Sequence, residues 1–231
     1  MTDDGRWVGL GDGVYARRHA ELDQTLGLVV GAWRCLVIDT GRDEVHGAAF
    51  AAAIRELTPL PWEVLVTHAH WDHFFGTAAF TPCRVWAHPR CREAIAADAK
   101  AQRAEWTRHY REQSKPGFAA DLAAARLELP TADVAERVEL DLGGRSVVLC
   151  HPGRGHTAGD VVAHVPDARV VFAGDLVEQG APPSAGPDAV PAEWPSTLDA
   201  VLALRPEVVV PGHGEPVDAE FVARQRDELR G

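Results

Sequence analysis

The sequence of 231 residues suits one substantial domain or at most two small ones. Hydrophobic residues make up 46% and charged residues 25%, which excludes a disordered or fibrous chain. The net charge of −11 is spread along the chain and would repel phosphate backbones and anionic lipids, so we expect no nucleic-acid or membrane partner. The 11 histidines stand out beside one Met and two Tyr, because histidine is the commonest metal ligand.

The sequence shows no sign of export. Its start, MTDDGRWVGL, lacks the basic and apolar regions of a secretory signal, and no apolar run approaches the roughly 18 residues of a membrane helix. The four cysteines show no CxxC spacing, so we expect reduced, buried thiols. These features predict a cytoplasmic protein with a small-molecule substrate, and they leave a homodimer open.

The first half of the chain alternates strands and helices. Apolar or alternating runs between Gly-rich turns predict strands at residues 7–10, 14–17, 25–30 and 35–40. Helical spacing of apolar residues predicts a helix over residues 43–57, which Pro59 and Pro61 end. Strands are predicted at residues 62–67 and 85–87. A helix is predicted from residue 89 to about 113, with Pro116-Gly117 as its stop.

The second half of the chain again alternates predicted strands and helices. Residues 137–150 and 161–174 read as hairpins, and residues 180–195 form a Pro/Gly-rich loop without periodicity. A helix (196–204), a strand (208–210) and a closing helix (218–229) follow. This order predicts an α/β fold in which two packed sheets carry helices outside, as a single domain over residues 1–231.

Residues 67–73 (THAHWDH) place three imidazoles and a carboxylate at the end of a predicted strand. A helix would display His68 and Asp72 together but would turn His70 away. A loop lets all four groups, including His73, converge, and strand ends are where sites are usually built. The apolar flanks EVLV and FFG disfavour a solvated His-rich turn.

Three further segments share the form of a strand followed by a Gly-flanked polar residue, and they contain His156, Asp175 and His213. Any one of them alone would be a weak signal. Together with the first cluster they offer five His and two Asp, a nitrogen and oxygen set suited to Zn²⁺, Fe or Mn²⁺. No cysteine belongs to this set.

The motif His68-x-His70-x-Asp72-His73, followed by the three later residues in order, resembles the signature of the metallo-β-lactamase superfamily, including its hydroxyacylglutathione-hydrolase-like members. The resemblance covers nearly the whole chain. It implies a four-layer αββα sandwich of two mixed sheets flanked by helices, with a two-metal site along one edge. It further implies that His68, His70 and His156 hold the first metal, that Asp72, His73 and His213 hold the second, and that Asp175 bridges both. The resemblance also places Asp39 near the metals, in a supporting or structural role.

This ligand set predicts hydrolysis. Two divalent ions, with Zn²⁺ favoured over Fe or Mn²⁺, lower the pKa of a shared water and supply a metal-bound hydroxide. Asp72 is the predicted catalytic residue, because it is placed to orient the nucleophile or pass a proton to the leaving group. The sequence contains no GxSxG motif, so we expect direct attack by water on a small ester, thioester or lactone.

Other branches of the family fit less well. The true β-lactamases of the superfamily have Cys or Ser where Asp175 stands, which argues against β-lactam hydrolysis. Its nucleases carry extra domains or basic surfaces, which the net charge of −11 disfavours. Residues 214–231 leave no room for a glutathione-binding domain, and Tyr15 and Tyr110 both precede the position where lactonases place a tyrosine. The main alternative is an oxidoreductase like the persulfide dioxygenases, with a single Fe. A metal-free regulatory module is disfavoured because no ligand is missing.

Residues near the motif are candidates for the substrate pocket. Trp71, Phe74 and Phe75 are either aromatic walls or plain core. The loop 178–194 is interpreted as a rim or lid rather than a linker, opposite the helix 89–113 and the turn 114–118. Asp160 has two interpretations: it accepts a hydrogen bond from a ligand imidazole, or it caps its own turn.

Overall fold

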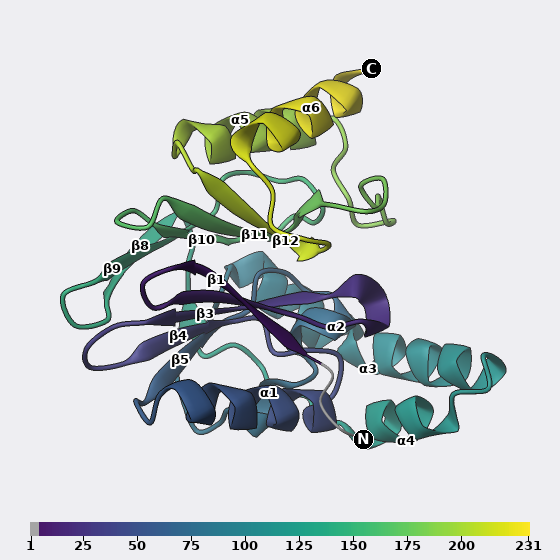
Figure 1. Cartoon of the computed structure of the whole chain (residues 1–231). Helices are drawn as coiled ribbons and strands as arrows, with labels where there is room; N and C mark the ends of the chain where they lie inside the picture. Colours follow the sequence, from purple (N-terminus) through teal and green to yellow (C-terminus); the bar gives the residue numbers. More distant parts are fainter. Residues whose placement is uncertain (1–4) are drawn as a thin grey trace.

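The computed structural model describes residues 5–231 and contains two mixed β-sheets packed face to face (Figure 1). The larger sheet has seven strands in the order β1 to β7, antiparallel as far as β4 and parallel from β4 onward. The smaller has five strands in the order β12-β11-β10-β9-β8, in which only β11 and β12 are parallel. The strands are β1 Arg6–Gly11, β2 Val14–Arg18, β3 Thr25–Val30, β4 Cys35–Ile38, β5 Trp62–Leu65, β6 Val85–Ala87, β7 Ala132–Asp133, β8 Arg137–Asp141, β9 Ser146–Cys150, β10 Val162–Val165, β11 Val170–Glu178 and β12 Val208–His213.

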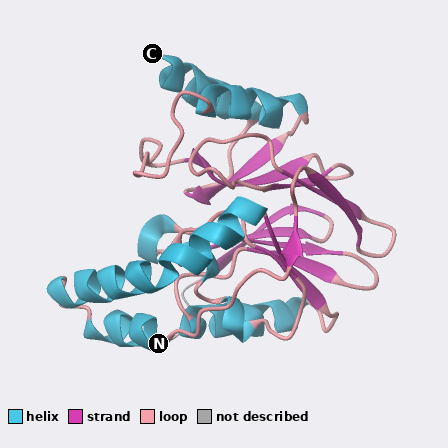
Figure 2. Cartoon of the chain, turned by 180° about the vertical axis from the view of Figure 1, so that it is seen from behind, coloured by secondary structure: helices cyan, strands magenta, loops and turns pink. Residues whose placement is uncertain are grey.

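Helices cover the outer face of each sheet (Figures 1 and 2). Phe50 of α1, Ile95 of α3 and Leu122 of α4 join the core on the outer side of the larger sheet. Leu198 of α5 and Val222 of α6 pack on the smaller sheet. The α-helices are α1 Glu44–Leu57, α2 Trp71–Phe74, α3 Pro89–Glu112, α4 Pro116–Ala124, α5 Trp194–Ala203 and α6 Ala219–Arg230, with 3₁₀ turns at Glu21–Asp23 and Thr77–Ala79.

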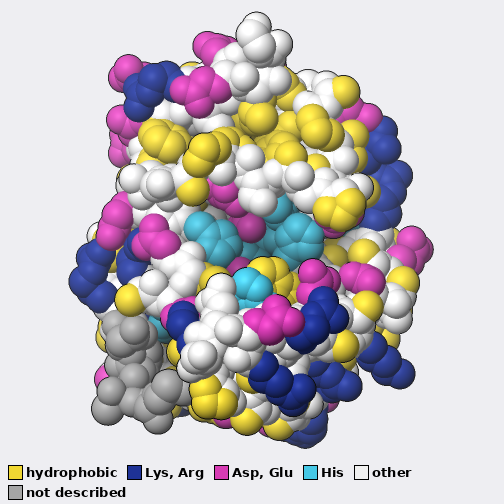
Figure 3. Space-filling model, turned by 90° about the vertical axis from the view of Figure 1, so that its right-hand side faces the viewer, with side chains coloured by type: hydrophobic (Ala, Val, Ile, Leu, Met, Phe, Trp, Pro, Cys, Tyr) yellow, Lys and Arg dark blue, Asp and Glu magenta, His cyan; other side chains and the backbone are white. Residues whose placement is uncertain are grey.

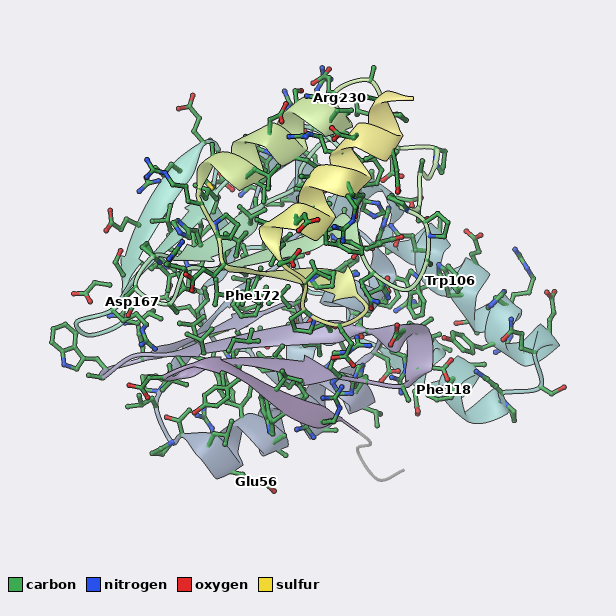
Figure 4. All side chains as sticks on the ribbon, turned by 45° about the horizontal axis from the view of Figure 1, so that its top comes forward. Glu56, Trp106, Phe118, Asp167, Phe172 and Arg230 are labelled. Carbon is green, nitrogen blue, oxygen red and sulfur yellow. The ribbon has the colours of Figure 1, made fainter. Side chains whose placement is uncertain are left out.

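The inner faces of the two sheets form a third apolar cluster. Ile38 and Leu65 of the larger sheet meet Phe172 and Val210 of the smaller one. The Phe172 ring reaches so close to Gly27 that a Cβ there would lie 2.6 Å from it (Figure 4). Strand side chains alternate between this cluster and the outer ones, as the pleat of a strand requires. The four layers confirm the αββα expectation.

Two local predictions are wrong. Residues 71–74 form the short helix α2 where a loop was expected, and only the segment before it is irregular. Pro116 does not end a helical region; α3 ends at Glu112 and Pro116 starts α4. A proline suits the first turn of a helix because the amide that it lacks would have no partner there.

No helix among residues 5–231 is both long and apolar enough to cross a membrane. The four cysteines are unpaired, as expected. Burial raises the pKa of Cys35 and of Cys83 to about 11, so these thiols stay protonated at neutral pH.

Candidate metal centre

The predicted site residues converge where the two sheets meet at one edge. His68 follows β5, Asp175 lies within β11 and His213 ends β12. The Val161 amide donates to the Thr67 carbonyl at 2.9 Å, which ties the loop beyond His156 to the end of β5. Ligand-bearing strand ends from both sheets therefore share one edge, as in other folds whose sites lie beyond the carboxyl ends of strands.

The motif itself combines a loop and a helix. His68 lies before α2, His70 caps its start, and Asp72 and His73 lie on its only turn. A helix that included His70 would have turned that side chain away from the others. Because α2 begins only after His70, all four side chains can converge.

His68, His70 and His156 form the first donor group. Their ligand atoms and that of Asp175 all lie within 4.8 Å of one another. His70 Nδ1 is 2.8 Å from His156 Nε2, and His156 Nε2 is 3.4 Å from Asp175 Oδ2. Such a cluster of nitrogen and oxygen donors is what a divalent ion requires.

Asp72, His73 and His213 form the second donor group, again within 4.8 Å of one another. His213 Nε2 is 3.2 Å from Asp72 Oδ2 and 3.4 Å from His73 Nε2. Burial lowers the pKa of His73, but the charges of Asp175, Asp72 and Asp39 outweigh it and hold that pKa well above its ordinary value. Negative charge therefore dominates around this group, which favours a cation.

Asp175 lies between the two groups. Its Oδ1 is 3.2 Å from His73 Nε2 and its Oδ2 is 3.7 Å from His68 Nε2. Two glycines make this position accessible. Gly174 has a φ of +54°, and a Cβ on Gly212 would lie 1.8 Å from Asp175 Oδ1. Gly174 and Gly212 thus leave the space that the Asp175 carboxylate occupies between the two donor groups.

All five imidazoles use their outward nitrogen for a hydrogen bond. His156 Nδ1 donates to the Ser184 carbonyl at 3.0 Å and His213 Nδ1 to the Leu22 carbonyl at 2.8 Å. A carbonyl can only accept, so the outer nitrogen of each ring carries a proton, and the inner nitrogen is the one that can ligate a metal. The remaining outward contacts are His68 Nδ1 to Thr67 Oγ1, His70 Nε2 to Asp188 Oδ2 and His73 Nδ1 to Asp39 Oδ2.

The inner atoms fit metal ions. His68 Nε2 and Asp175 Oδ1 are buried and have no hydrogen-bond partner. A buried polar atom without a partner costs about 1–3 kcal/mol. Burial holds the pKa of His68 well below its ordinary value, so this ring is neutral and able to ligate. A cation bound at the donor groups would satisfy these atoms, so the residues present fit divalent metal ions.

The centre forms the floor of a cavity of about 860 Å³. Figure 3 shows histidine side chains in a hollow at the centre of one face, with carboxylates beside them. Trp71 lines the cavity, whereas Phe74 and Phe75 belong to the apolar core. Residues of the loop 178–194 also line it, as the rim interpretation predicted, and so does α3, but the turn 114–118 does not.

Asp160 caps its turn. Its carboxylate accepts hydrogen bonds from the Thr157 amide at 2.9 Å and the Thr157 hydroxyl at 2.7 Å. Burial raises its pKa to about 7. The turn-capping interpretation therefore describes its contacts. The carboxylate that contacts an imidazole of the first donor group is instead Asp188, which is the partner of His70.

Sequence reasoning missed Asp188, Ser184 and Trp106. The first two lie in the aperiodic loop, and Trp106 lies on α3 beside Trp71, with ring centroids 4.5 Å apart (Figure 4). The helical stripe of α3 was the only signal for Trp106, and nothing local marked Asp188. The six other histidines stay outside both donor groups.

Comparison with known proteins agrees with this geometry. Residues 21–213 match the family model described as the metallo-beta-lactamase superfamily. The chain is 27% identical over 172 residues to a metallo-beta-lactamase type 2 from Bacillus cereus, covering 73% of this chain and 57% of that protein. It is 26% identical over 234 residues to the human acyl-coenzyme A thioesterase MBLAC2, covering 93% and 83% of the two chains.

The chain thus spans 57% of the length of that first relative. Among solved structures, a metallo-beta-lactamase from Pontibacter korlensis superposes with a TM-score of 0.76 at 19% identity, covering 99% of this chain and 100% of that one. This likeness concerns the fold. With its matched motif and two-sheet architecture, the chain belongs to the metallo-beta-lactamase superfamily.

Proposed function

We propose that this protein is a dinuclear, zinc-dependent hydrolase of a small ester, thioester or lactone. One observation carries the proposal: two donor groups lie on either side of Asp175 at the floor of the cavity, and the outer nitrogens of their imidazoles are anchored by hydrogen bonds. His68, His70 and His156 would hold one ion, and Asp72, His73 and His213 the other. When bound, the ions supply a Lewis acid for the acyl carbonyl and acidify a water molecule.

Asp72 would transfer a proton from the attacking water to the leaving group. Hydrolysis breaks the acyl bond, adds the water oxygen to the acyl carbon and returns a proton to the leaving oxygen or sulfur. Asp72 lines the cavity, and Gln24 Nε2 donates to its backbone carbonyl at 2.5 Å, which fixes the segment that carries it. Its carboxylate is thus held at the floor, where it can accept the water proton and pass it on.

The names of the relatives are compatible with acyl transfer to water. The human relative is named an acyl-coenzyme A thioesterase and the Bacillus cereus relative a metallo-beta-lactamase. Both names describe attack on an acyl carbon. These names support the proposal that the chain hydrolyses an acyl compound, and the walls of the cavity would select the leaving group.

Activity of metal-defined protein tests the proposal. Protein stripped by a chelator and reloaded with Zn²⁺ should hydrolyse at least one of a panel of thioesters, esters and lactones, and stripped protein should not. Two Zn²⁺ per chain should restore full activity. One Fe per chain with oxygen uptake on a persulfide would contradict the proposal, and so would equal hydrolysis by stripped protein.

A further inference from the structure

We propose that the substrate of this site carries a positive charge, an ammonium or similar cation, at the end remote from the scissile bond. The inference rests on the proposed hydrolase function and names the substrate class. It follows from the charge of the cavity walls, from two carboxylates that point to no cation of the protein, and from a stacked tryptophan pair beside them.

The cavity has an acidic lining. Among the described residues, its walls contain several carboxylates and neither Lys nor Arg. Asp72 and Asp175 belong to the floor, where ions would offset their charge. The other carboxylates lie on α3, at the end of β11, on the loop after it and on the 3₁₀ turn near Leu22. An anion entering this cavity would face like charge on several sides.

Most of these wall carboxylates already have partners. Asp23 pairs with Arg18, Asp188 with His70, and Glu178 accepts from the Ser184 amide at 2.9 Å. Asp98 and Glu105 differ: both are exposed on the cavity side of α3, and neither makes an ion pair or side-chain hydrogen bond within residues 5–231. They are separated by about two helical turns along α3, so each offers an unpaired carboxylate to a cation in the cavity.

An aromatic surface lines the same cavity as Asp98 and Glu105. Trp106 directly follows Glu105, and its ring stacks on Trp71 with an interplanar angle of 25°. Both residues line the cavity, but Trp71 is only 4% exposed, so Trp106 is the ring that a cation would contact. The face of a tryptophan is the strongest aromatic partner for a cation, and carboxylates next to such a ring are a common arrangement for ammonium recognition.

This wall is fixed to the metal centre. Gln102 lies between Asp98 and Glu105, and its side chain accepts from the Trp71 amide at 2.9 Å and donates to the Ala69 carbonyl at 3.0 Å. The segment 69–71 is part of the metal-binding motif. The distance from the cationic subsite to the scissile bond is thereby held constant, which is what a specificity wall requires.

Anionic substrates fit this cavity poorly. Coenzyme A thioesters, glutathione thioesters and β-lactams carry phosphate or carboxylate groups that need a Lys or Arg. The guanidinium of Arg18 is engaged by Asp23, and that of Arg90, at the start of α3, lies 3.5 Å from the Ala158 carbonyl. Neither lines the cavity. The net charge of −11 adds long-range attraction for cations.

Three thioacetates of matched shape test the inference on the zinc-loaded protein. Acetylthiocholine carries a quaternary ammonium, 3,3-dimethylbutyl thioacetate is its neutral isostere, and S-acetyl-3-mercaptopropanoate carries a carboxylate. We expect kcat/KM for the cation to exceed that for the neutral isostere about tenfold, with the anion slowest. The double variant Asp98→Asn/Glu105→Gln should bring the cation-to-neutral ratio close to one, and Glu93→Gln, on the same helix outside the lining, should leave the ratio unchanged.

A binding measurement separates the two proposals. Calorimetry with phenyltrimethylammonium and the zinc-loaded protein should show binding that the double variant loses. Hydrolysis of the three thioacetates at equal rates, or fastest for the anion, would overturn the inference and leave the hydrolase function standing. Binding of the cation without hydrolysis of any acyl substrate would overturn the function and keep the cationic subsite. Absence of cation binding would reject the subsite in either case.

Discussion

The two donor groups use similar side chains but are held by different parts of the molecule. In the second group, His73 is held by Asp39, whose side chain is 3% exposed. In the first group, His70 is held by Asp188, whose side chain is 48% exposed and lies on the rim loop. His156 likewise donates to a loop carbonyl, that of Ser184. His73 is therefore fixed by the core, whereas His70 and His156 are fixed by a surface loop.

The two kinds of acceptor hold their imidazoles with different firmness. A buried acceptor keeps an imidazole in one orientation, whereas a loop acceptor holds it only while the loop is in place. Because the same loop lines the cavity, a substrate that displaces it would disturb His70 and His156 and leave His73 in place. The following predictions test that contrast, beginning with the largest effect.

Asp175→Asn removes the charge that both groups share. We expect loss of several kcal/mol of transition-state stabilisation, or roughly a thousandfold in kcat/KM, and weaker binding of both ions. Metal content per chain, measured after gel filtration, checks the second point. Asp167→Asn, at a distant turn where the side chain meets Arg145, should change neither quantity (Figure 4). A variant that kept both ions and full activity would refute the shared role.

Asp39→Asn should weaken metal binding, most directly at His73 of the second group. Its carboxylate accepts from His73 Nδ1 at 2.8 Å and from the Thr67 hydroxyl at 2.8 Å. Replacing such an acceptor costs about 10–100-fold in metal affinity, and burial places this one near the upper end. Competition with a chromogenic chelator measures the affinity. Asp43→Asn, a buried helix cap with no imidazole of either group as partner, serves as the control.

Asp188→Asn should weaken the first group by about tenfold, the lower end of that range, because water can replace an exposed acceptor. The same chelator competition reports it. Glu193→Gln, in the same loop but paired with Arg154, should leave metal affinity unchanged. If Asp188→Asn weakened binding as much as Asp39→Asn, the contrast between core and loop would be wrong.

The smallest effect concerns pH. Burial, with the charges of His151 and Arg90, lowers the pKa of His88 to about 4, and the His88 ring lies 4.3 Å from that of His151, beside the segment carrying His156. The unfolded chain binds this proton near pH 6.5, so His88 contributes stability above that pH that is lost as pH falls toward 4.

His88→Asn tests this. Asparagine keeps an acceptor for the Arg90 amide, which His88 Nδ1 now accepts at 3.0 Å, and it does not titrate. Denaturant unfolding between pH 7 and pH 4 should show a flatter loss of stability than in the unsubstituted protein. If the free energy of unfolding fell with pH as steeply in the variant as in the unsubstituted protein, the pH dependence would come from other groups.

Most of the floor of the site was predictable from sequence, and its walls were not. The motif at residues 68–73 and the glycines beside Asp175 and His213 are local patterns that strand ends impose. Asp188 acts from a loop without periodicity, and its partner His70 is 118 residues away, so no local pattern could connect them. The stop predicted at Pro116 failed because proline both ends and begins helices.

The centre also joins distant parts of the chain. His73, on α2 just after strand β5 of the larger sheet, and His213, at the end of β12 in the smaller sheet, are 140 residues apart in the sequence, and their Nε2 atoms lie 3.4 Å from each other. An ion held by both would act as a reversible cross-link between the two sheets, closing a long loop as a disulfide would in an oxidising compartment. Metal supply would then govern how firmly the two halves of the sandwich are held together, and an empty centre would leave that edge open to separation.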